Sequence, residues 1–100
     1  MKKYMNKKVI IRASEAGVFY GTLVDKEGTE VELANCRRIW YWEGAASLSE
    51  LALSGVTEPE KCHFTVTVPS IVVMGVIEII LCSQKAVKCI NKVPVWKMSK

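Results

Sequence analysis

The chain has 100 residues, a formal net charge of +4 and 50% hydrophobic residues, which suits one packed domain and excludes a disordered chain. The mild basicity permits an anionic partner but falls short of the charge of a dedicated nucleic-acid binder. No secretory signal is visible, and the most apolar segment, 71–82, is shorter than the ~20 residues that a membrane-spanning helix needs. We therefore expect a single domain over residues 1–100, in the cytoplasm and without membrane contact.

Strand patterns dominate the chain, with two short helical segments among them. In chain order, the spacing of apolar and turn residues predicts strands over 8–12, 18–25, 29–34 and 37–42, a helix that begins after Ser47 and ends at Gly55, strands over 61–68 and 71–81, a short helix over 84–91 and an extended segment over 94–96. Segment 71–81 is predicted to be the longest and most buried strand, after a turn at Pro69-Ser70. The fold class is therefore mainly β.

The pattern also predicts the conformation or orientation of individual residues at three places. Phe19 and Leu23 fall on one face of their strand and Tyr20 falls on the other, because side chains alternate along a strand. Gly28 is expected to take a positive φ in a tight turn. Asn35-Cys36 is expected to bend the chain before the next strand begins.

The most informative stretch is Arg37-Arg38-Ile39-Trp40-Tyr41-Trp42, which combines two permanent cations with three large rings. Rings can stack on a base, and guanidinium groups can pair with phosphate. A loop of small residues, 44–49, follows and leads into the helix, where Ser47 and Glu50 form a predicted capping box. Backbone N–H groups at a helix start can bind an anion. The stretch therefore predicts a nucleotide-binding surface.

The candidate ligand-binding residues are Tyr20, Arg37, Arg38, Trp40, Trp42, Gly44, Ala45, Ala46, Ser47 and Ser49. A base would stack on one of the rings, one arginine would hold phosphate, and the loop would supply N–H donors. Structural alternatives stay open: any single ring can be core packing, one arginine can pair with a nearby glutamate, and the whole stretch can form an oligomer interface. On a regular strand Arg37 and Arg38 point to opposite faces, so we expect them to have different roles.

The sequence gives catalysis and metal binding little support. The single histidine, His63, is next to Cys62, and strand neighbours face opposite sides, so the two cannot act as a nucleophile–base pair. The four cysteines lack the spacing of a zinc site and are expected to be reduced. We therefore expect a protein that is not an enzyme and that uses no cofactor and no metal.

The first half of the chain resembles an Sm-like or SH3-like barrel. The first Sm motif is similar to segments 9–12, 18–23, 25–28 and 31–35, and the second motif is similar to 73–80. In that second motif the family has an arginine before the glycine, where this chain has Met74, and the family lacks the insertion over 42–61. The resemblance implies a small antiparallel barrel, partly open, with an inserted helix and a short C-terminal helix.

A second resemblance covers nearly the whole chain. The segments 37–42 and 44–49, the strand at Phe64, the strand over 77–80 and the terminal segment 93–97 are similar to an uncharacterised family of small bacteriophage proteins. This resemblance implies a viral protein in the host bacterial cytoplasm. By analogy with other compact phage proteins, it suggests a homo-oligomeric sponge that sequesters a nucleotide-derived immune signal without changing it. A single-stranded RNA binder of the Sm type and a structural or interaction module are the alternatives.

Overall fold

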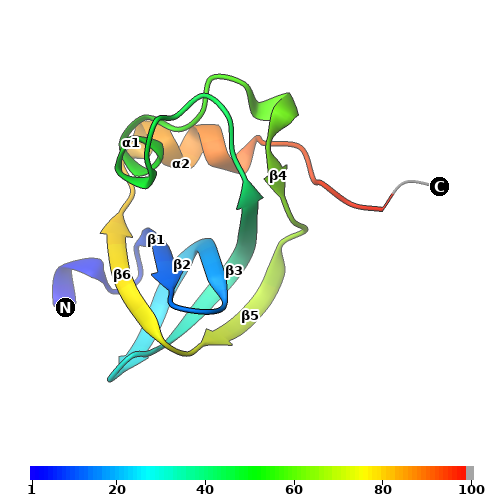
Figure 1. The fold of residues 1–100 in the computed structure, drawn as a ribbon. Coiled ribbons are helices and arrows are strands. Elements are labelled where there is room, and N and C mark those ends of the chain that lie inside the picture. The colour runs from blue at the N-terminus through cyan, green and yellow to red at the C-terminus, as the bar shows by residue number, and fades with distance from the viewer. Residues whose placement is uncertain (99–100) are drawn as a thin grey trace.

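An antiparallel sheet of six strands carries two helices on one side (Figure 1). The structure is a computed structural model that describes residues 1–98. In chain order its elements are η1 (Lys2–Tyr4), β1 (Lys8–Ala13), β2 (Gly17–Glu27), β3 (Glu30–Tyr41), α1 (Leu48–Ser54), η2 (Pro59–Lys61), β4 (His63–Phe64), β5 (Val68–Val73), β6 (Val76–Leu81) and α2 (Gln84–Asn91).

The sheet curls into a small barrel that remains partly open. Strands β1, β2 and β3 form the central meander, β6 pairs with β1, and β4 and β5 pair one after the other with β3. Strands β5 and β6 follow one another through a turn at Gly75, whose φ is +74°, yet they pair with opposite edges of the meander. The barrel therefore stays open between them, and the mainly β fold class predicted from the sequence is confirmed.

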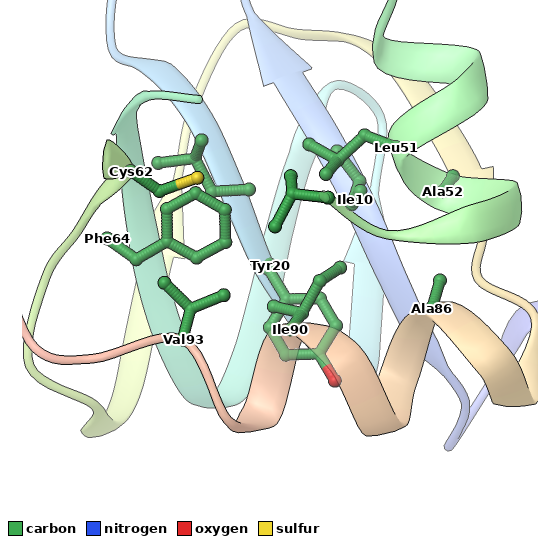
Figure 2. Close-up of a cluster of buried hydrophobic side chains, with 11 residues drawn as sticks. Ile10, Tyr20, Leu51, Ala52, Cys62, Phe64, Ala86, Ile90 and Val93 are labelled. Carbon is green, nitrogen blue, oxygen red and sulfur yellow. The ribbon is translucent and has the colours of Figure 1, made fainter. Parts of the chain in front are cut away.

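The meander is buried on both faces, which gives the protein two hydrophobic cores. The first lies inside the barrel and includes Phe19, Leu23 and Leu33, each almost fully buried. The second lies between the outer face of the sheet and the two helices, where Tyr20 and Phe64 meet residues of α1 and α2 (Figure 2). Phe19 and Tyr20 thus point to opposite faces, as the alternation predicts.

Strand β3 is one continuous strand, where the sequence predicts two segments with a bend between them. The bend is a β-bulge at Asn35, whose φ is +49°, and the pairing with β2 shifts its register across this position. Leu33 and Cys36 both face the barrel core because the bulge adds one residue between them. Beyond the bulge, Arg38 and Trp40 continue on the barrel side, while Arg37 and Ile39 face the helices.

Two strand predictions for the second half are wrong. Segment 61–68 contains only the two-residue strand β4 and the first residue of β5, and Val66 between them is 53% exposed. Segment 71–81 is divided by the turn at Gly75 into β5 and β6, and most side chains of β6 are half-buried or exposed. The predicted turn at Pro69-Ser70 is part of β5, an edge strand, where a proline without an N–H group is tolerated.

Both predicted helices are confirmed. Ser47 Oγ accepts a hydrogen bond from the Glu50 N–H at 3.1 Å, and Glu50 Oε1 accepts one from the Ala46 N–H at 2.6 Å. Gly55 ends α1 with a φ of +78° and donates its N–H to the Leu51 carbonyl. Helix α2 buries Ala86 and Ile90 against the sheet. Neither helix, nor any other in residues 1–98, is long and apolar enough to cross a membrane.

Candidate functional site

Arg37 is buried, with 5% of its surface exposed, and it works as a structural crosslink. Its guanidinium donates to four backbone carbonyls: Nε to Thr65 at 2.9 Å, Nη1 to Ile90 at 2.9 Å, and Nη2 to Phe64 and Pro94 at 3.3 Å each. These acceptors belong to the β4 region, the C-terminal end of α2 and the segment after it. Burial lowers the pKa of Arg37, and neighbouring Tyr20 counteracts this. The predicted ligand contact of Arg37 is therefore wrong.

Tyr20 is also removed from the predicted ligand-binding set. Its side chain is 1% exposed in the core under the helices, and its hydroxyl donates to Asn91 Oδ1 at 2.8 Å. Burial raises the pKa of Tyr20, so the phenol stays protonated. A ligand base cannot reach this ring without unpacking α2.

The loop 44–49 does not form the predicted anion cradle. The N–H of Ala46, in the loop, is already bonded to the carboxylate of Glu50, and the N–H of Glu50, just after the loop, is bonded to the hydroxyl of Ser47. An anion placed there would compete with a carboxylate and be repelled by it. Gly44 is packed against the backbone of Thr57 and Glu58. The predicted roles of Gly44, Ala46 and Ser47 are thus replaced by packing and capping, whereas those of Ala45 and Ser49 stay predictions.

Arg38 and Trp40 lie side by side on the barrel-facing side of β3, beyond the end of the barrel core. The Arg38 guanidinium lies over the Phe19 ring, 4.7 Å from its centroid, and Trp40 is 63% exposed. Two hollows flank the pair. The Phe19 hollow, of about 210 Å³, is lined by Phe19, Cys36, Arg38, Trp40, Val66 and Ile71. The Gly17 hollow, of about 270 Å³, is lined by Ala16, Gly17, Val18, Arg38, Trp40 and Trp42.

Trp42 differs from Trp40 although the sequence places both on one face. Strand β3 ends at Tyr41, so the alternation stops there. The Trp42 ring packs partly against the core under the helices, and its Nε1 donates to the Ala45 carbonyl at 3.1 Å. Trp42 lines the Gly17 hollow while its ring is also engaged in this packing and hydrogen bond, so it is less free than Trp40 to offer a stacking face.

A row of rings continues from Trp40 across the surface. The rings of Trp40 and Trp96 meet edge to face with centroids 6.5 Å apart, and Trp96 stacks on His63 at 4.4 Å with an interplanar angle of 8°. Tyr41 lies 5.4 Å from His63 on the other side. We call Arg38, Trp40, Tyr41, His63 and Trp96 the Trp40 surface.

Sequence reasoning missed His63 and Trp96 as parts of this site. Trp96 reaches it because its N–H donates to the Phe64 carbonyl at 2.9 Å and Val95 forms a parallel bridge with Phe64. A further hollow of about 430 Å³ lies beyond Trp96, against Val66 and Met98. The only signal was the pattern Pro94-Val95-Trp96, which predicts an extended segment without saying what it pairs with.

The cysteines near the site are poor nucleophiles. Cys36, at the base of the Phe19 hollow, has a pKa raised by burial to about 11, an effect that Arg38 and Lys8 partly offset. Cys62 is buried in the core under the helices, whereas His63 is half-buried and stacks on Trp96, so the two side chains point apart as expected. Within residues 1–98, no three histidine, cysteine or acidic side chains gather to hold a metal ion.

Cys36 gives the protein a predicted alkaline instability. Its pKa rises from 9.0 to about 11 on folding, so the folded state holds its proton more tightly than the unfolded state. The resulting stability is complete below pH 9 and is lost as the pH rises toward 11. Urea unfolding followed across this range should show a falling midpoint. A Cys36→Ala variant should show a shallower decline, and an equally steep one would assign the effect to other groups.

Residues 6–90 match the profile of a protein family described as Domain of unknown function (DUF6948). The chain belongs to this family. No curated protein and no solved structure matches it. The DUF6948 match runs from the residues before β1 to Ile90 in α2. It therefore contains Arg38, Trp40 and His63 of the Trp40 surface and ends before Trp96.

Proposed function

We propose that this DUF6948 protein is a binding module for a nucleotide, which it holds without chemical change. The base stacks on Trp40 and a phosphate group pairs with Arg38. The observation that carries this proposal is the pairing of a 63% exposed indole with a guanidinium on one face of β3, each lining the same two hollows. When a flat partner such as a base covers an indole this exposed, apolar ring surface leaves water, and this burial stabilises the complex.

The setting of Arg38 supports a phosphate contact. The guanidinium carbon lies over the Phe19 ring, 4.7 Å from its centroid, and this cation–π contact restrains the donor fork before a ligand binds. A fork held in this way loses less rotamer entropy when it binds a bidentate acceptor. Its two neighbours in the Phe19 hollow, Cys36 and Trp40, are uncharged, so no carboxylate in the lining competes for it.

The sizes of the hollows indicate a partly covered ligand. At about 210 and 270 Å³, each is smaller than the roughly 300–1,000 Å³ of sites that enclose a whole small molecule. Each suits one base or one phosphate group. A second copy of the chain would complete the enclosure, which fits the proposed homo-oligomeric sponge for a nucleotide-derived immune signal in a phage-infected bacterial cytoplasm.

An oligomer interface is the second candidate for the Trp40 surface. Trp40, Trp96, Val66 and Val95 are each at least 45% exposed, and clustered exposed apolar side chains are typical of interaction surfaces. If this is their main role, light scattering gives a mass above 11.2 kDa, and Trp40→Ala reduces it without any nucleotide. A single-stranded RNA binder would instead lose affinity steeply with salt, through counterion release.

Arg38→Lys tests the proposed phosphate contact. The change keeps the charge but loses the planar fork, so binding of a cyclic adenine dinucleotide should weaken by ~1–3 kcal/mol, the scale of a hydrogen bond to a charged group. Isothermal titration calorimetry measures this loss. Arg12→Lys is the matched control, because Arg12 pairs with Glu78 on the surface. Parent, Arg38→Lys and control proteins that bind alike would contradict the phosphate role of Arg38.

A further inference from the structure

A hollow of about 490 Å³ lies at the opposite end of the strands from Trp40, between the segment before β1, the end of β6 and the flank of α2. Lys8 is at the start of β1, whereas the residues nearest Trp40 pair with its other end. The hollow is lined by Asn6, Lys7, Lys8, Leu81, Val87 and Lys88, together with Cys82 and Gln84. We call it the lysine hollow.

The charged residues of this lining are all positive, and its other polar side chains, Asn6 and Gln84, are neutral. Three lysines line it, Lys7 and Lys8 from the N-terminal side and Lys88 from α2, and no carboxylate lines it among the described residues. The ion pairs between described residues involve Arg12 and Lys61, not these three lysines. Like charges held together without a counter-ion repel one another, so an anion that entered would relieve the repulsion.

Part of the lining is apolar, and one of the three lysines, Lys8, is restrained beside it. Leu81 and Val87 supply aliphatic surface, and Leu81 is 41% exposed. The Lys8 ammonium lies 5.3 Å from the centroid of the buried Tyr20 ring, which holds it in place from beneath. Gln84, Val87 and Lys88 lie three and four residues apart, so they share one flank of α2.

We propose that the lysine hollow is a second ligand site, for a small phosphorylated organic molecule with an apolar body. The phosphate group would contact Lys7 and Lys88, and the apolar body would cover Leu81 and Val87. The volume falls within the range of small-molecule sites, unlike the two hollows at Trp40, and this favours a small ligand over a nucleic-acid strand. The site is independent of the proposed nucleotide function of the Trp40 surface.

The test uses 1-naphthyl phosphate as probe, with 1-naphthol and inorganic phosphate as its two halves. Titration followed by amide chemical shifts should show 1-naphthyl phosphate binding at Leu81 and Lys88, more tightly than either half. Lys7→Gln/Lys88→Gln should weaken binding by about tenfold or more, because two charge-assisted contacts are lost. Lys26→Gln/Lys85→Gln removes the same charge from outside the lining and should bind like the parent.

Three results would overturn the proposal. The first is no binding of 1-naphthyl phosphate at millimolar concentration. The second is an equal loss in both double variants, which would mean attraction by net charge alone. The third is chemical-shift change at the Trp40 indole in place of Leu81 and Lys88, which would assign the probe to the other surface. Failure of the Arg38→Lys test leaves all three readouts unaffected, so the two proposals fail separately.

Discussion

Arg37→Met should lower the free energy of unfolding by roughly 3 kcal/mol or more, because buried carbonyls that lose their donor cost about 1–3 kcal/mol each. Four carbonyls lose a donor in this variant: those of Thr65 and Pro94 lose their only donor among the described residues, whereas those of Phe64 and Ile90 keep the backbone N–H groups of Trp96 and Val93. In a domain of this size such a loss lowers the melting temperature by more than about 10 °C. Calorimetry or thermal circular dichroism measures it.

Arg38→Met is the matched control for this prediction. It removes the neighbouring guanidinium, which contacts the Phe19 ring and accounts for no carbonyl hydrogen bond among the described residues. An exposed cation–π contact contributes about 0.5–1 kcal/mol, so this variant should melt only slightly below the parent. Two variants with equal melting temperatures would contradict the crosslinking role of Arg37.

Gly44→Ala should destabilise the protein by about 2–4 kcal/mol, from backbone strain together with overpacking. Gly44 has a φ of +91°, and an added Cβ would collide with the backbone N and the hydroxyl of Thr57 and lie 2.8 Å from the Glu58 N. The loop before α1 would have to move away from the segment after it. Denaturant unfolding measures the cost, with a lower midpoint expected at an unchanged slope.

Gly28→Ala separates the strain from the collision. Gly28 also has a positive φ, +61°, but an added Cβ there meets nothing within 4 Å. The control should therefore cost about 1 kcal/mol, the strain alone. If Gly44→Ala costs no more than Gly28→Ala, the loop is looser than its packing against Thr57 indicates. Since Gly44 lies away from Arg38, nucleotide binding by the folded fraction should be unchanged in both variants.

Local patterns predicted the parts of the fold that depend on neighbours in sequence. Alternation placed Phe19 and Tyr20 on opposite faces, and the Ser47–Glu50 spacing identified the start of α1. The same alternation failed after Lys61, because Val66 and Thr67 lie in a connection between two short edge strands. The extents of β4 and β5 are set by their pairing with β3, and a local sequence pattern does not reveal where the partner strand lies.

The candidate site was predictable only in part for the same reason. Strand geometry assigned Arg37 and Arg38 to opposite faces and therefore to different roles, but it could not say which of them is buried. That choice depends on the bulge at Asn35, since a shift of one residue exchanges the two faces of a strand. His63 and Trp96 joined the surface through contacts between β4 and the segment after α2, which are distant in sequence.

The link between β4 and the segment after α2 also bears on the order in which the protein folds. Trp96 reaches the surface only when its N–H meets the Phe64 carbonyl and Arg37 meets the carbonyl of Pro94. Trp40 and Trp96 are more than half of the chain apart, and contacts of such separation form late because a long loop must close first. During synthesis from the N-terminus, β1 to β3 can therefore pair while the Trp40 surface still lacks Trp96. The Trp40 surface is completed only once Trp96 has been made and docked.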